Sequence, residues 1–336
     1  MIGHNMILCR IISIVIGAGL DLLIGDPARM PHPVRWIGAL VDALEKLIRL
    51  EGDTPAIERV KGGVVTVFVL SIVTQISWGL LARAYAVHTL AGIALESVMC
   101  CYALAARSLR DASMEVYRPL VADRPDPPSG PNIEKARTAV SMIVGRDTEA
   151  LDQKGIIRAA VETVAENTAD GVIAPLFYMM LGGAACAMAY KAVNTMDSMI
   201  GYRNEKYQYY GTAAARLDDI AGFIPARLSG LLIVVAAKLT GMDAAGAWRI
   251  FKRDRYAHKS PNSAQSESAC AGALGVQLAG DAVYFGKVVE KPLIGDPLRE
   301  IEAEDIPRAN RLMYTASGLC LVLVIVCLAV AALVMR

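Results

Sequence analysis

Several short signatures of soluble enzymes are missing from this 336-residue sequence. It has no G-x-x-x-x-G-K-[ST] phosphate loop, no G-x-G-x-x-G after a strand, no H-E-x-x-H and no G-x-S-x-G. The sequence therefore lacks the nucleotide-binding motifs of soluble enzymes. The seven cysteines include no C-x-x-C pair and mostly lie in apolar runs, so we expect neither a zinc site nor a disulfide framework. A net charge of +1 argues against a globally basic protein that binds nucleic acid.

The chain is unusually apolar. Hydrophobic residues make up 54% of it, charged residues 20%, and the mean hydropathy is +0.40. This balance is too apolar for an ordinary soluble domain and too charged for a simple bundle of lipid-embedded helices. We therefore predict a single integral membrane domain over residues 1–336, embedded in the lipid bilayer and carrying substantial polar loops.

Six segments approach the roughly 20 apolar residues that are needed to cross a bilayer. They are Met6 to Ile24, Gly63 to Leu81, Ala86 to Ala106, Val172 to Tyr190, Ile220 to Leu239 and Leu312 to Met335. No small-residue cleavage site follows the first segment, so we expect a retained helix there. The predicted fold is all-α, a polytopic helical membrane protein with five to six membrane segments, some broken or re-entrant, and sizeable helical cytoplasmic loops.

Three long loops are rich in lysine and arginine, at 26–61, 107–170 and 241–311. Six spans put all three on one face, and the positive-inside rule makes this face cytoplasmic. We therefore predict a multi-pass protein of the cytoplasmic membrane whose active site opens to the cytoplasm. The same count puts 191–216 on the opposite face, although its polar residues look like parts of one site. Either two of the apolar segments are broken or re-entrant, or the motifs meet near mid-bilayer.

Polar residues of catalytic type are concentrated between Gly145 and Leu228, and ionisable groups are costly near a bilayer unless they face a protein interior or a watery cavity. Arg158, Glu162, Glu166 and Asp170 recur every four residues, so on a helix they form one stripe, with Asn167 beside it. Carboxylates on one face can hold Mg²⁺ together with substrate phosphates. A solvated helix face with an Arg–Glu pair is the alternative.

Two further clusters follow along the chain. Asn194 and Asp197 come at one-turn spacing after Lys191, which suits a site but also a helix end with capping residues. Asp218 and Asp219 lie between Arg216 and Arg227. Adjacent acids with flanking arginines suit a metal-bridged phosphate, and the alternative is a buried ion-pair network.

The basic run after Trp248 fits a positive cluster near lipid headgroups. It leads into Lys259 and the Ser260-Pro261-Asn262 corner, which can present backbone N–H groups to an anion. Near the N-terminus, His32 sits in a turn-rich stretch, where a lone histidine is more often structural.

Taken in order, seven motifs closely resemble the membrane-bound adenosylcobinamide-phosphate synthases of cobalamin biosynthesis, the CbiB or CobD family. They are LDLLIGDPARMPHPVRWIG (20–38), GRDT (145–148), ETVAENTADGVIAPLFY (162–178), AVNTMDSMIGY (192–202), AARLDDIAGFIPARL (214–228), SPN with Glu267, and GALGVQLAG (272–280). The sequence departs from the family pattern at Gly222, Ala264 and Gln265. The resemblance implies an ATP- and Mg²⁺-dependent amide ligase that joins adenosylcobyric acid, a corrinoid, to aminopropanol or its O-phosphate. Association with other late cobalamin-pathway membrane enzymes is a further expectation.

Chemistry and the resemblance together suggest roles. A carboxylate must be activated, most simply as an acyl phosphate, before it condenses with an amine, and phosphoryl transfer needs metal ions and cationic side chains. We expect catalytic residues among Glu162, Glu166, Asp197, Asp218, Asp219 and His32, one of which removes the amine proton. Mg²⁺ ligands are expected from Glu166, Asp170, Asp218 and Asp219. Phosphate and cosubstrate contacts are expected from Arg216, Arg227, Lys259, Ser260, Asn262, Asn167 and Asn194.

Two other classes of protein also place polar groups in membranes. An intramembrane prenyl- or phospho-transferase carries aspartates at four-residue spacing on one helix, whereas the acids here are spread over separate segments. A transporter predicts inverted repeats, and the sequence has none. A non-catalytic membrane sensor is the remaining alternative.

Overall fold

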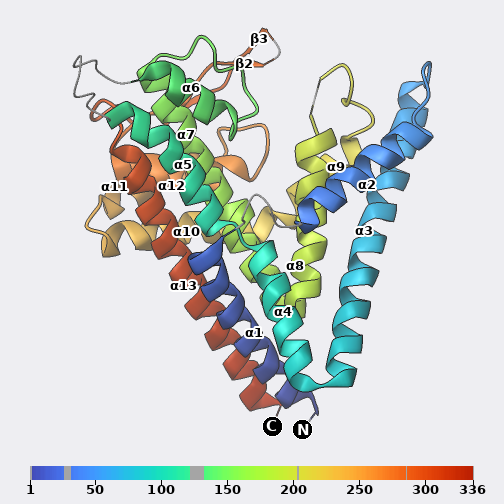
Figure 1. Ribbon diagram of the computed structural model, residues 1–336. Helices are drawn as coiled ribbons and strands as arrows, with labels where there is room; N and C mark the ends of the chain where they lie inside the picture. Colours follow the sequence, from blue (N-terminus) through green and yellow to red (C-terminus); the bar gives the residue numbers. More distant parts are fainter. Residues whose placement is uncertain (1, 26–31, 122–131, 203, 285, 336) are drawn as a thin grey trace. The chain divides into compact units, whose positions relative to one another are not determined.

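The computed structural model describes residues 2–25, 32–121, 132–202, 204–284 and 286–335. The sequence DRPDPPSGPN at 123–132 is rich in proline and glycine and predicts a turn between two helical stretches, and all of it except Asn132 lies outside the described residues. Most of the described chain is helical, as Figure 1 shows. The chain divides into two compact units, residues 1–105, 174–223 and 321–336 in unit 1 and residues 106–173 and 224–320 in unit 2.

The expected polytopic helical membrane protein is confirmed. Five helical segments are long and apolar enough to cross a bilayer: Asn5–Ile24, Pro55–Val87, Thr89–Val121, Gln153–Ile200 and Asp305–Val334. A bent pair, Thr212–Ala221 and Phe223–Leu239, adds a sixth if it is one span.

Unit 1 is a bundle of long helices. Its elements are α1 (Ile2–Ile24), α2 (Pro33–Ile48), α3 (Pro55–Val87), α4 (Thr89–Ala103), α8 (Ala174–Ile200), α9 (Thr212–Ala221) and the last part of α13 (Asp305–Val334). Proline at the first position and a capping side chain begin α2 and α3, because Nδ1 of His32 and Oγ1 of Thr54 accept hydrogen bonds from the first turns. Helix α4 packs against α1, α3 and α8.

Helix α8 is broken at Gly182 and Gly183, whose dihedral angles are not helical. Its second half begins beside α4, where Glu96 accepts a hydrogen bond from the N–H of Ala184. It ends beside α2, where the side chain of Met199 lies against Gly38. The chain beyond it is held to α2 and α3. Arg49 donates a hydrogen bond to the carbonyl of Lys206, and a Cβ at Gly62 would lie 1.8 Å from the carbonyl oxygen of Tyr210.

These contacts correct one topological prediction. Six straight spans require 191–216 and 26–61 to lie on opposite faces, but the segment 204–211 packs on the end of α2 and the start of α3. Figure 1 likewise shows α2 and α9 at the end of unit 1 opposite the α3–α4 turn. The physical reason is the Gly182–Gly183 break, because it interrupts the segment that was expected to cross. The broken-helix alternative is therefore the right one for α8.

Unit 2 combines shorter helices with two small strand pairs. Its helical elements are α5 (Ala106–Val121), α6 (Ile133–Ser141), α7 (Gln153–Thr168), the π-helix η1 (Ala169–Ile173), α10 (Phe223–Leu239), α11 (Ala244–Asp254), α12 (Ser263–Leu274) and the first part of α13. The strands are β1 (Leu278–Ala279), β2 (Ala282–Tyr284), β3 (Lys287–Val289) and β4 (Leu293–Ile294). Strand β1 pairs with β4 and β2 with β3, both antiparallel. Such short strands show no alternating pattern in sequence.

Helix α12 is the centre of unit 2, and all its residues after Ser263 are buried. It approaches α11 so closely that a Cβ at Gly272 would lie 2.4 Å from the carbonyl oxygen of Gly246. Gly275, with φ of +67°, ends the helix in the left-handed conformation. Two glycines of GALGVQLAG thus serve close packing and chain reversal, and they direct the chain into β1.

Candidate functional site

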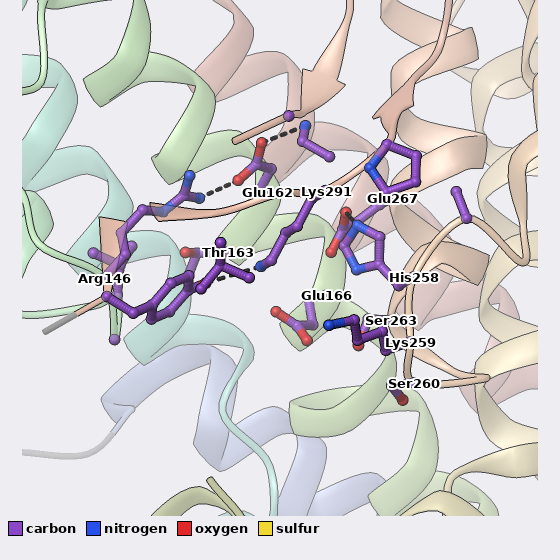
Figure 2. Close-up of a pocket in the computed structure, with 18 of the residues that line it drawn as sticks. Arg146, Glu162, Thr163, Glu166, His258, Lys259, Ser260, Ser263, Glu267 and Lys291 are labelled. Atoms are coloured by element: carbon purple, nitrogen blue, oxygen red, sulfur yellow. Dashed lines mark hydrogen bonds and ion pairs between the residues drawn. The ribbon is translucent and has the colours of Figure 1, made fainter. Parts of the chain in front are cut away.

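A cavity of about 360 Å³ in unit 2 brings together four segments that are far apart in sequence. Its walls come from the chain before α7, from α7 itself, from the turn that leads into α12, and from the strand region 279–292. Figure 2 shows the polar side chains of these segments around one space. The volume is within the usual range for small-molecule sites.

Glu162 is a buried carboxylate at one wall. Its Oε1 accepts a hydrogen bond of 2.6 Å from the backbone N–H of Ala279, and its Oε2 is paired with Arg146. Ala279 has a φ of +59°, unusual for a residue with a side chain, which is how its N–H faces the carboxylate. Burial disfavours the charge on Arg146, but the charge and hydrogen bond of Glu162 outweigh it and raise the pKa of the guanidinium. Glu162 therefore ties α7 to the strand region.

Glu166 lies one turn further along α7 and is half-buried beside the same cavity. Within the described chain, no hydrogen bond or ion pair engages its carboxylate. Asn167 also lines the cavity, and its side chain donates to the carbonyl of Thr163. Of the predicted residues on α7, Glu166 is thus the carboxylate that is available to a ligand.

The predicted four-residue stripe ends earlier than expected. Arg158, Glu162 and Glu166 lie on α7, but Asp170 falls in the π-helix η1, where the longer turn breaks the i, i+4 register. Glu162 and Glu166 line the cavity, whereas Arg158 and Asp170 are not among its lining residues. Sequence spacing alone gives no sign of this π-turn.

Cationic groups face these carboxylates from two other segments. Lys259 and Ser260 line the cavity just before α12, whose first N–H groups form a helix N-terminus that favours anions. Lys291 enters from the strand region, and its ammonium binds the hydroxyl of Tyr284 at 2.9 Å. Asn262 is buried and accepts a hydrogen bond from Arg227 at 3.5 Å, so Arg227 supports the turn.

Gln265 fixes the turn that leads into α12. This fully buried side chain donates to the backbone carbonyls of Arg255 and Pro261, both at 3.1 Å. Gln265 thus fixes the loop that carries Lys259 and Ser260.

The other predicted residues belong to unit 1. Arg216 and Asp219 on α9 line a second cavity of about 350 Å³ together with Tyr202, Tyr207 and Gln208. Asn194 and Asp197 are half-buried near the end of α8. Asp218 lies on α9, which packs against α8.

His32, the predicted base, has a structural role in the described chain. Its Nδ1 accepts the N–H of Val34 at 3.2 Å, and its ring meets Tyr102 edge-on. A catalytic role for His32 stays a prediction, as do the assigned roles of the other site residues.

Sequence reasoning missed several residues of the unit 2 cavity. Arg146 was visible only as part of GRDT, and His258 only as part of a basic run. Lys291 and Tyr284 belong to a strand region with no catalytic motif. Within the described residues, no group of three His, Cys, Asp or Glu side chains gathers closely enough to hold a metal ion.

Comparison with known proteins decides the family. The family model described as CobD/Cbib protein matches residues 14–313. The chain belongs to the CobD/CbiB family. Cobalamin biosynthesis protein CobD of Klebsiella pneumoniae is 50% identical over 306 residues, which cover 91% of this chain and 93% of the relative. Cobalamin biosynthesis protein CbiB of Salmonella typhimurium is 49% identical with the same coverage. No solved structure matches the chain.

The family membership gives this multi-pass membrane protein a role in cobalamin biosynthesis. It also confirms the family resemblance that the motifs indicated.

Proposed function

We propose that this protein is an ATP- and Mg²⁺-dependent amide ligase that joins adenosylcobyric acid to aminopropanol or its O-phosphate, and that the reaction takes place in the unit 2 cavity. The main observation behind the proposal is that the Glu166 carboxylate has no hydrogen-bond or ion-pair partner in the described chain. It lines the same cavity as Lys259, Lys291 and the start of α12. Membership of the CobD/CbiB family supports the choice of substrates.

The charge distribution suits phosphoryl transfer. Making an acyl phosphate from a carboxylate and ATP spreads negative charge over the transferred group, which cationic side chains and helix N-termini stabilise. Lys259 and the first N–H groups of α12 come from one segment, and Lys291 comes from another. A phosphate in the cavity would therefore be held from two sides.

The acidic residues fit magnesium in a limited way. Mg²⁺ in phosphoryl-transfer sites is commonly held by one or two carboxylates, with substrate phosphates and water completing the octahedron. Glu166 could supply such an oxygen. A bound Mg²⁺ would neutralise phosphate charge.

We also propose that the cavity opens to the cytoplasm. The unit 2 segments that form it belong to the basic stretches 107–170 and 241–311, and such stretches favour the cytoplasmic face. ATP is available on that side of a cytoplasmic membrane.

Product formation tests the proposal directly. Purified protein in detergent is mixed with ATP, Mg²⁺, adenosylcobyric acid and aminopropanol phosphate or aminopropanol, and the amide product is detected by mass spectrometry alongside nucleotide hydrolysis. We expect hydrolysis only when both the acid and an amine are present. Nucleotide hydrolysis without amide, or no turnover with either amine, would contradict the proposal.

A matched pair of variants locates the reaction. Glu166→Gln keeps the size of the side chain but removes its charge, and we expect product formation to fall by at least about 100-fold, or about 2.7 kcal/mol of transition-state stabilisation. Glu149→Gln changes an exposed glutamate of the same unit and should leave turnover unchanged. Equal activity of both variants would remove the reaction from this cavity.

A further inference from the structure

His258 and Glu267 form a buried pair in the wall of the unit 2 cavity that none of the predicted roles uses. Nε2 of His258 lies 3.4 Å from Oε2 of Glu267, and neither atom has a hydrogen-bond partner in the described structure. Glu267 is only 3% exposed. Buried polar atoms nearly always have a hydrogen-bond partner. Two such atoms that face each other at a cavity wall without one therefore suggest a place where a ligand or a proton binds. Figure 2 shows both side chains directed into the same space as Glu166 and Lys291.

The pair is held in place by its surroundings. Glu267 lies one turn into α12, and His258 lies in the turn that Gln265 fixes through the carbonyls of Arg255 and Pro261. Titratable groups reach the cavity from every surrounding segment: Arg146 before α7, Glu162 and Glu166 on α7, Lys259 and Lys291.

These surroundings disfavour charge on both members. Burial, together with the charges of Glu166 and Glu162, raises the pKa of Glu267 well above its ordinary value. Burial, with the charge of Lys291 added, lowers the pKa of His258 to about 4. At neutral pH the imidazole therefore has a nitrogen lone pair. A neutral imidazole can accept a proton without first losing one.

We propose that His258 is the base that removes the proton from the substrate's amine as the amide bond forms, and that Glu267 is its positioning residue. This rests on the proposed function, which supplies the activated acyl group as an acyl phosphate. His258 takes one proton from the substrate's ammonium group, and Glu267 stabilises the resulting imidazolium. The freed nitrogen lone pair forms the C–N bond to the acyl carbon. The bond from that carbon to the phosphate oxygen breaks, and its electron pair leaves with phosphate, which takes the second N–H proton.

Hydroxylamine separates this role from the rest of the reaction. It is unprotonated at neutral pH and attacks acyl phosphates without help from a base, giving a hydroxamate. Aminopropanol and its phosphate are protonated amines and need one. For His258→Ala and His258→Gln, we expect amide formation to fall about 10²- to 10⁴-fold. Hydroxamate formation, measured in the same preparation with ATP, Mg²⁺ and adenosylcobyric acid, should fall far less.

Glu267 is tested by the pH profile. Glu267→Gln keeps the shape of the side chain but cannot become a carboxylate, so the imidazolium loses its support. We expect kcat for the amide to fall about 10-fold, with KM for the amine unchanged and the pH dependence of kcat displaced. A merely structural role would change both products and leave the profile in place.

His88 offers a matched control, because it is exposed and its Nδ1 caps α4 by accepting the N–H of Leu90 at 3.2 Å. His88→Asn retains a capping side chain and should alter neither product. Equal losses of amide and hydroxamate in both His258 variants would overturn the inference. A wild-type protein that makes neither product would defeat the proposed function itself, and with it the role of His258.

Discussion

Glu96 on α4 accepts a hydrogen bond of 3.3 Å from the backbone N–H of Ala184, 88 residues away in sequence, at the point where α8 is broken. In an unbroken helix this N–H would bind a carbonyl of the preceding turn. Here a carboxyl oxygen from another helix replaces that carbonyl and accepts the N–H at the start of the second half of α8. Its other oxygen accepts the hydroxyl of Tyr85 at 2.5 Å. The break is therefore a built feature of unit 1.

Gly183 makes this arrangement possible, and its substitution is the first test. Its φ of +70° and ψ of −162° are almost exclusive to glycine, and a Cβ would lie 2.4 Å from Oε1 of Glu96. We expect Gly183→Ala to destabilise the protein by about 2–4 kcal/mol through backbone strain and overpacking. The measurement is the thermal unfolding midpoint of detergent-purified protein.

Gly79→Ala on α3 is the matched control. Among the described residues, no atom outside its own helix backbone lies within 4 Å of that Cβ position. Alanine is the better helix former, so stability should stay the same or rise slightly. A Gly183→Ala protein that melts with the wild type would show that the break does not depend on this glycine.

Several sequence features were sufficient to predict the membrane fold and part of the site. Glu162, Glu166 and Lys259 were identified from motif and spacing, and all three line the unit 2 cavity. The Gly182–Gly183 pair is a recognised turn signal, so the break in α8 could have been located from sequence. Lys291 could not, because a three-residue strand carries no period and its position depends on how β2 and β3 fold over the cavity. The π-turn at Asp170 was equally invisible, since it is a property of tertiary packing.

A second prediction concerns the Arg146–Glu162 pair. Both side chains are mostly buried, so Glu162→Gln leaves a buried guanidinium without its counter-charge, while the amide oxygen can still accept the N–H of Ala279. We expect a loss of about 3–5 kcal/mol. Arg146→Met in the same protein removes the unpaired charge and should restore part of the stability. A double variant that is less stable than Glu162→Gln alone would show that Arg146 stabilises the fold without this partner.

A third prediction concerns pH. The raised pKa of Glu267 means that the folded protein keeps a proton that the unfolded chain releases near its ordinary pKa. This contribution is complete in acid and is lost as pH rises toward the folded pKa. The lowered pKa of His258, about 4, acts in the opposite direction, and its contribution is lost as pH falls below about 6.5. Above that pH the His258 contribution is constant.

Comparison of the thermal unfolding midpoints of the wild type and Glu267→Gln between pH 5 and pH 9 therefore isolates Glu267, because both proteins share every other titrating group. We expect the wild-type midpoint to fall as pH rises through this range more steeply than that of Glu267→Gln, which has no carboxyl group to ionise. Parallel profiles for the two proteins would mean that Glu267 is already a carboxylate in the folded protein.

The last prediction tests the corrected topology within unit 1. Arg49 binds the carbonyl of Lys206, and Tyr207 donates to Glu45 at 3.1 Å, so the segment 204–211 and the α2–α3 connection must share one side of the membrane. Single cysteines at the exposed positions Glu51 and Glu205, in a protein from which the seven native cysteines are removed, should react with an impermeant maleimide from the same side. A cysteine at Val87, beside the α3–α4 turn, should react only from the other side, because α3 is long enough to cross.

Six straight spans instead predict that Glu51→Cys and Glu205→Cys are labelled from opposite sides. Labelling of intact cells and of inverted vesicles distinguishes the two topologies. Labelling of Glu51→Cys and Glu205→Cys from opposite sides would mean that the Gly182–Gly183 break does not return the chain to the α2 end of unit 1.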